Sequence, residues 1–171
     1  MSGLADTITR CNLHLKLDND TEGYGNCFPN AIIQQCRRSE VKGWLMQKDP
    51  VKVIKSQHSL RRQVKNFALT FENTNLEKYK ENYYQILNKT DKSWEEYWNE
   101  MGKEGVWVDT VFVQLTAWYI GLDIKILTTS STPENPFIIV SGNIDASSIA
   151  VRGPPLLLGY YTNVHYQSLL P

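Results

Sequence analysis

The order of the hydrophobic patterns along this chain is the strongest constraint on its fold. Five segments carry apolar side chains at intervals of three and four, the spacing of helices that bury one face: residues 28–36, 60–71, 76–87, 94–101 and 110–120. Four strand-like runs follow, at residues 122–127, 137–140, 156–161 and 164–170. Helices early and strands late predict an α+β fold, as a single domain over residues 1–171.

Local signals place some of the element ends. Leucines alternate with polar residues from 13 to 17, which predicts a short, half-buried strand ahead of a glycine-rich turn. Asp109 can cap the last of the helices and Gly121 can end it. Residues 41–58 have a mixed pattern, which predicts a loop with one short helix.

Composition excludes several classes of function. The chain has 171 residues, 42% apolar and 21% charged, which suits one domain with a buried core. Its 18 basic and 18 acidic residues leave no net charge, so we expect neither nucleic acid nor an anionic membrane as a partner. No run approaches the roughly 18 apolar residues of a membrane span, and the N-terminus lacks a signal-peptide pattern. We therefore expect a soluble protein.

The cysteines favour a reduced protein. Cys11, Cys27 and Cys36 are an odd number without a paired C-x-x-C, which predicts neither a disulfide framework nor a zinc site. A reducing compartment such as the cytoplasm, or a host cytosol for an effector, would keep a nucleophilic thiol active. Cys36 continues an apolar helix face and is predicted to be buried rather than reactive.

Cys27 stands where a thiol can be activated. It precedes the helix of residues 28–36, and Pro29 suits a first helical turn. The unpaired N–H groups and the dipole of a helix N-terminus favour a thiolate, the nucleophilic form of cysteine. The alternative is a structural cysteine buried at an ordinary helix start.

The loop before Cys27 can supply an oxyanion hole. Gly23 and Gly25 allow backbone conformations with positive φ. The backbone N–H groups of Tyr24, Gly25 and Asn26, with that of Cys27, could then converge on the oxyanion of a tetrahedral intermediate.

His165 is the candidate base. It lies 138 positions after Cys27 (165 minus 27), and a nucleophile and its base are often far apart in sequence. Strand alternation places His165 and Gln167 on one face, so that Gln167 can orient the imidazole. For an isolated histidine a structural role is the commoner outcome, and the pairing with Cys27 is what favours catalysis.

Three separated segments form a recognisable set: residues 24–28 (Tyr-Gly-Asn-Cys-Phe), residues 105–126, which begin Gly-Val-Trp-Val-Asp, and residues 165–169 (His-Tyr-Gln-Ser-Leu). Together they resemble the OTU (ovarian tumour) family of papain-like cysteine proteases, most of whose members are deubiquitinases. Their order and separation are similar to the family pattern over about residues 13 to 170.

This resemblance implies a papain-like fold with a small central sheet flanked by helical lobes. It implies hydrolysis of the bond after the C-terminal glycine of ubiquitin, polyubiquitin or a ubiquitin-like modifier, with Cys27 as nucleophile and His165 as acid and base. Trp107 is a candidate wall of the cleft for the Gly-Gly tail, with core packing as the alternative. Neither a metal nor an organic cofactor is expected.

The sequence departs from the family pattern at two positions. Tyr24 replaces an acidic residue, and Gln167 replaces the usual Asp or Asn two residues after the histidine. For the third catalytic residue, which would accept the imidazole Nδ1–H, Gln167 is the first candidate, Asn163 the second and Asp20 (with Asp18) the third.

Two other functions remain open at this point. One is a catalytically weak ubiquitin-binding module of the same fold, suggested by Gln167. The other is a thiol hydrolase that acts on another acyl or amide bond. Arg61, Arg62 and Lys65 are interpreted as a solvated helix face.

Overall fold

The computed structural model describes residues 3–20, 24–48, 57–70, 92–144, 153–161 and 165–171. The described helices are α1 (Leu4–Arg10), α2 (Cys27–Arg37), α3 (Ser39–Lys48), α4 (Gln57–Leu69), α6 (Trp94–Met101) and α7 (Thr110–Ile120). The described strands are β1 (Lys16–Leu17), β2 (Ile124–Thr132), β3 (Asn135–Val140), β4 (Leu156–Tyr161) and β5 (His165–Leu170). The helix expected over residues 76–87, Gly23 and Asn163 lie outside the described ranges.

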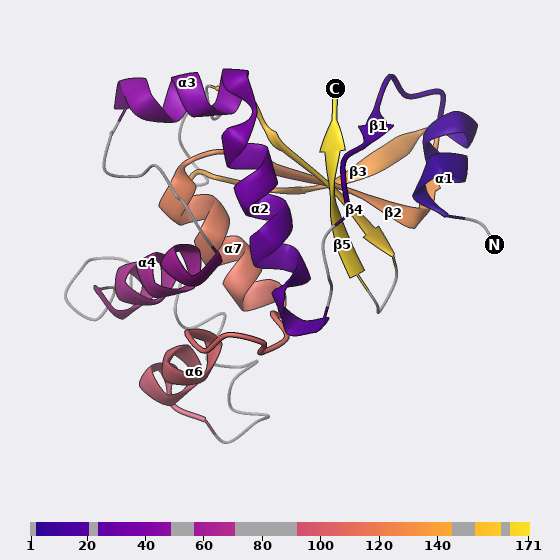
Figure 1. Ribbon diagram of the computed structural model, residues 1–171. Helices are drawn as coiled ribbons and strands as arrows, with labels where there is room; N and C mark the ends of the chain where they lie inside the picture. Colours follow the sequence, from indigo (N-terminus) through magenta and orange to yellow (C-terminus); the bar gives the residue numbers. More distant parts are fainter. Residues whose placement is uncertain (1–2, 21–23, 49–56, 71–91, 145–152, 162–164) are drawn as a thin grey trace.

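The predicted α+β class is confirmed, with most helices on one side of a mixed five-stranded sheet (Figure 1). The strand order is β1-β5-β4-β2-β3. The β2–β4 pair is parallel, and the β1–β5, β4–β5 and β2–β3 pairs are antiparallel. β5, which carries His165, therefore lies inside the sheet between β1 and β4.

Both faces of the sheet are covered. The larger core lies between one face and the helices α2, α3, α4, α6 and α7, and it includes Leu156 and Leu158 of β4. The smaller core lies under α1, where Leu4 and Ile8 pack with Leu157 of β4. Successive residues of a strand point to opposite faces, so a strand covered on both faces reads as a continuous apolar run.

Helix α7 begins and ends where the sequence predicts. The Asp109 side chain accepts hydrogen bonds from the backbone N–H groups of Val111 (3.0 Å) and Phe112 (3.2 Å). Gly121 ends the helix in the left-handed region at φ 77°, where glycine has no side-chain penalty. The Tyr97 hydroxyl also donates to Asp109, which ties α6 to the start of α7.

A buried glutamine joins α2 to the sheet. Gln35 donates from Nε2 to Ser168 Oγ (2.8 Å) and to the Leu169 carbonyl (2.6 Å), and its Oε1 accepts from the Leu157 N–H (2.8 Å). These bonds connect the helix that begins at Cys27 with β4 and with β5. A shift of the helix along the sheet would leave these buried polar atoms without partners, which is costly. The bonds therefore fix the position of the helix on the sheet.

Two helices differ from the sequence prediction. α1 was not expected, because seven residues with Leu4, Thr7 and Ile8 buried are too few for a clear period. α3 has ten residues, of which eight (41–48) lie in the region predicted as loop with one short helix, and only Val41 and Leu45 are buried in it. None of the helices within the described ranges is both long and apolar enough to cross a membrane.

Candidate active site

The candidate nucleophile lies at the start of a helix and on a pocket. Cys27 is the first residue of α2 and follows a short 3-10 helix, Tyr24–Asn26, as the sequence predicts. Its side chain is 2% exposed, yet it lines a pocket together with Gly25, Trp107, His165 and Tyr166. The predicted nucleophile and base therefore face one cavity, although they come from a helix and a strand far apart in the chain.

The imidazole of His165 bonds to Asp20. Its Nε2 lies 2.6 Å from Asp20 Oδ1, at the end of β5 that faces the pocket. With Nε2 occupied by a carboxylate, Nδ1 is the ring nitrogen left for the thiol of Cys27. We expected the orienting group at Nδ1, but the carboxylate lies at Nε2.

Gln167, the first candidate for this contact, has other partners. It is buried, its Nε2 donates to the Asp18 carbonyl (2.9 Å), and its Oε1 accepts from the Tyr161 hydroxyl (3.2 Å). The expected bond to the imidazole is thus replaced by one to the segment that carries Asp20. Whether Gln167 or Asp20 serves in catalysis stays a prediction, and Asn163 is not described.

Strand pairing explains why Asp20 reaches the histidine. β1 runs antiparallel to β5, with Lys16 opposite Leu170 and Leu17 opposite Leu169. The Asp18 N–H continues this ladder to the Ser168 carbonyl at 3.0 Å. Two residues further, the chain arrives near the His165 end of β5. The leucine alternation predicted a half-buried strand at 13–17, but β1 covers only Lys16–Leu17 and both residues are exposed. The alternation also did not say which strand the segment joins.

Gly25, in the loop before Cys27, has no room for a side chain. We expected a positive φ at Gly25, but within the described ranges the glycines with positive φ are Gly105, Gly121 and Gly153. A Cβ on Gly25 would lie 1.8 Å from the Gly105 carbonyl oxygen. The loop therefore needs glycine because another backbone passes against it. The oxyanion role of the Tyr24, Gly25 and Asn26 N–H groups stays a prediction.

Arg61 is buried, which corrects the prediction of a solvated face. Its side chain is fully enclosed, whereas Arg62 is exposed and Lys65 is half-buried. Arg61 stands three residues before Val64 and seven before Ala68, both buried, so helical spacing places it on the inner face of α4. That spacing was the signal available in the sequence.

Trp107 lies on the surface rather than in the core. It is 56% exposed and lines the pocket beside Cys27, so the core-packing alternative is wrong. Its role as a wall for a substrate tail stays a prediction.

Burial keeps two further ionisable side chains, Tyr166 in the pocket and Cys36 in the core, in their neutral forms. Burial is the main cause that raises the pKa of Tyr166, with further contributions from Tyr160, Cys27 and Asp109, so its hydroxyl stays protonated. Burial also raises the pKa of the Cys36 thiol to about 12, which makes it unreactive near neutral pH. In the part of the chain that the structure describes, no cluster of three or more His, Cys, Asp or Glu residues could hold a metal ion.

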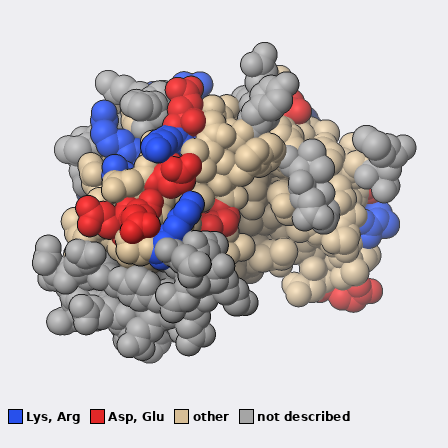
Figure 2. Space-filling model, turned by 90° about the horizontal axis from the view of Figure 1, so that it is seen from below, with Lys and Arg blue, Asp and Glu red and all other residues tan. Residues whose placement is uncertain are grey.

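Charge is mixed on the face shown in Figure 2. Acidic and basic side chains gather together on its left, and a broad area in the middle carries neither. This pattern agrees with the absence of net charge in the sequence.

Comparison with solved structures gives the fold class. The OTU domain of OTUD1 matches 92% of this chain and 86% of its own, with 14% identity and a TM-score of 0.58. An OTU deubiquitinase from Wolbachia pipientis wMel matches 91% of this chain and 88% of its own, with 13% identity and a TM-score of 0.56. A structure of an OTU deubiquitinase from Wolbachia pipientis wMel bound to ubiquitin matches 91% of this chain and 95% of its own, with 14% identity and a TM-score of 0.52.

The viral OTU domain protease from Taggert virus matches 92% of this chain and 80% of its own, with 16% identity and a TM-score of 0.54. The sequence itself matches no family model and no curated protein. At these identities the comparisons show the fold alone: the protein has the OTU fold that the motifs predict.

Proposed function

We propose that the protein is a cysteine isopeptidase that hydrolyses the bond after the C-terminal glycine of ubiquitin. The observation that carries this proposal is the convergence of Cys27 and the Asp20-bonded His165 on one pocket of an OTU fold. A solved deubiquitinase of similar fold with ubiquitin bound supports the choice of substrate.

The reaction follows from the placement of these groups. Nδ1 of His165 takes the proton of the Cys27 thiol, and the sulfur attacks the glycine carbonyl carbon. The imidazolium, stabilised by the Asp20 carboxylate, returns the proton to the departing lysine amine as the C–N bond breaks. Water, deprotonated by the same imidazole, then attacks the thioester, releases the ubiquitin carboxylate and restores the thiol.

The surroundings of the pocket suit a flat peptide tail. Trp107 stands exposed on one wall and Tyr166 on another, and aromatic faces pack well against glycine backbone.

A second, apolar pocket adjoins the first and shares Thr110, Tyr160 and Tyr166 with it. It includes Ile138 of β3, a large apolar side chain that is 56% exposed. Exposed apolar area next to a reactive centre is typical of surfaces that bind a partner. We propose that it contacts the folded part of ubiquitin.

One contact weighs against the alternative of a catalytically weak binding module. This alternative was suggested by the neutral Gln167, but the imidazole bonds to the carboxylate of Asp20 instead. The three cysteines are free in the structure, which supports our further proposal that the protein acts in a reducing compartment such as the cytoplasm.

A ubiquitin probe with a C-terminal electrophile tests the proposal. We expect a covalent adduct with the protein that is absent in Cys27→Ala, and Cys36→Ala is the matched control because its thiol is buried and protonated. Tight binding without an adduct would favour the binding module. Reaction of Cys27 with small acyl esters, without binding or cleavage of any ubiquitin-like protein, would favour a thiol hydrolase of another substrate.

A further inference from the structure

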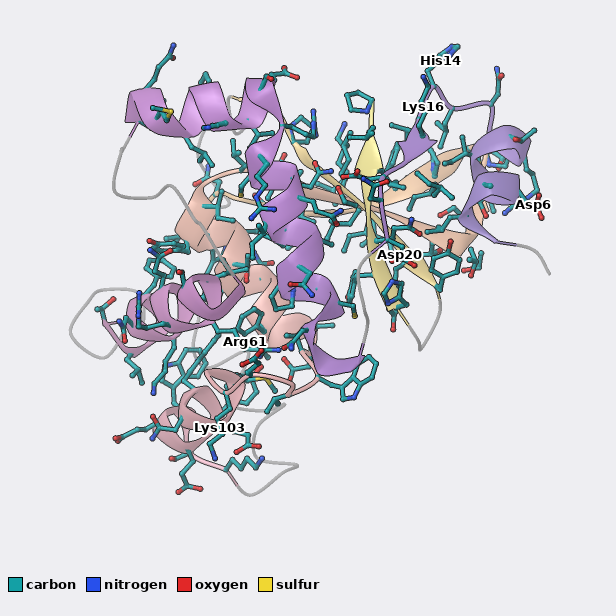
Figure 3. The ribbon with its side chains drawn as sticks, in the orientation of Figure 1. Asp6, His14, Lys16, Asp20, Arg61 and Lys103 are labelled. Atoms are coloured by element: carbon teal, nitrogen blue, oxygen red, sulfur yellow. The ribbon has the colours of Figure 1, made fainter. Side chains whose placement is uncertain are left out.

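A buried guanidinium holds the loop of the candidate nucleophile. Arg61 of α4 donates from Nη2 to the Gly25 carbonyl (2.8 Å), to Asn26 Oδ1 (3.2 Å) and to the Val106 carbonyl (2.7 Å). Its Nη1 donates to the Met101 carbonyl at 2.8 Å. Figure 3 shows Arg61 among the helices, between α4, α6 and the N-terminal ends of α2 and α7.

Packing alone does not explain a cation at this position. Removing a guanidinium from water is costly, and an apolar side chain of similar length would fill the same space without that cost. Burial lowers the pKa of Arg61, and the Glu104 carboxylate opposes the shift, so the guanidinium remains charged. Its bonds therefore indicate what the charge is for, and three of its four acceptors belong to the two segments beside the pocket.

The bond to Gly25 sets the direction of the next N–H group. In a trans peptide the C=O and N–H point in opposite directions, and no cis bond occurs in the described ranges. Because the Gly25 carbonyl is turned toward Arg61, the N–H of Asn26 is turned away from it. This N–H immediately precedes Cys27 in the chain.

The same guanidinium joins the two segments. The side chain of Asn26, which accepts from Arg61, also accepts from the Gly105 N–H at 2.8 Å. Gly105 is also the residue whose carbonyl leaves no room for a Cβ on Gly25. The cysteine loop and the segment leading to Trp107 are thus fixed against each other by one side chain from a third element.

We propose that Arg61 is a positioning residue for the oxyanion site: by holding the Gly25 carbonyl, it keeps the Asn26 N–H directed at the oxygen of an acyl group on Cys27. This inference rests on the thiol chemistry of the proposed function but not on the identity of the substrate.

The test separates acyl transfer from the reactivity of the thiol. Acylation of Cys27 by p-nitrophenyl acetate passes through an oxyanion, whereas alkylation by iodoacetamide does not. Arg61→Lys keeps the positive charge but loses the planar set of guanidinium N–H donors. Arg61→Gln keeps one neutral NH₂ donor group and loses the charge. We expect each to slow acylation about 100-fold, as for the loss of an oxyanion donor, with alkylation of Cys27 changed less than about threefold.

Two further variants complete the experiment. Arg62→Lys, at the exposed neighbouring position, should leave both rates unchanged. Asn26→Ala removes one acceptor of Arg61 and the bond to Gly105, and it should slow acylation about tenfold with the same spared alkylation. Thermal unfolding will show whether the Arg61 variants fold. If they do not, Asn26→Ala still tests the proposal, because it leaves the Arg61 side chain present.

Acylation at the wild-type rate in a folded Arg61→Lys protein would overturn the proposal. So would an equal loss of acylation and alkylation, because it would mean a general loss of the loop structure. If wild-type protein is acylated by the ester but does not cleave ubiquitin conjugates, the proposed substrate fails while the role of Arg61 is still measured. A wild-type Cys27 that no ester acylates would overturn both.

Discussion

The two sides of the candidate site are held in place by different means. On the helical side Cys27 is enclosed, and its loop is fixed from within by the buried Arg61. On the sheet side His165 is placed by strand pairing, and its partner Asp20 has a side chain that is 57% exposed. Water competes for an exposed hydrogen bond, so we expect the contact on the sheet side to be the weaker of the two until a substrate covers it.

Gln35 connects the two sides. It comes from the helix that begins at Cys27 and bonds to β5 three and four residues after His165. The site thus has an enclosed nucleophile, a buried hydrogen-bonded link to the base, and a carboxylate at the surface beside the imidazole.

The largest effect is expected at the base. His165→Ala should lower kcat for a ubiquitin conjugate at least about 1,000-fold. No group would then accept the proton of the thiol or donate a proton to the leaving amine. Thermal unfolding should change little, since the imidazole is only partly buried. Steady-state kinetics and calorimetry measure these quantities. A variant that keeps a tenth of wild-type kcat would contradict the role of His165.

The next largest effect should divide Asp20 from Gln167. Asp20→Ala should lower kcat about 10- to 100-fold with unchanged stability, since it removes the group that orients the imidazole. Gln167→Ala should lower kcat less and lower the melting temperature instead, because the Asp18 carbonyl and the Tyr161 hydroxyl both lose a partner. If Asp20→Ala kept the wild-type kcat while Gln167→Ala lost kcat at an unchanged melting temperature, Gln167 would again be the orienting residue.

The smallest effect is expected at the apolar pocket on the sheet side. Ile138→Glu should raise KM for ubiquitin conjugates about tenfold at constant kcat, the cost of a substantial interface contact. Ile139→Glu is the matched control, because Ile139 is 59% exposed but points to the other face of β3. Equal KM values for the two variants would show that this pocket does not bind the substrate.

Local signals predicted much of the fold. The helix from Thr110 to Ile120 was correct at both ends because its cap and its terminating glycine lie next to it in sequence. The helix start at Cys27 was correct because Pro29 and the apolar spacing from Phe28 onward lie in its own first turns. α1 was missed, and α3 was expected only as one short helix within residues 41–58, because short helices with few buried residues owe their stability to tertiary packing.

The sequence by itself determined the α+β class and placed Cys27 at a helix start and His165 on a late strand, since these follow from patterns a few residues long. Only the tertiary structure decided that Asp20 meets the imidazole and that Arg61 reaches the cysteine loop. The reason is physical: both contacts depend on which strand pairs with β5 and on where α4 packs, and those choices minimise the free energy of the whole chain rather than of any one segment.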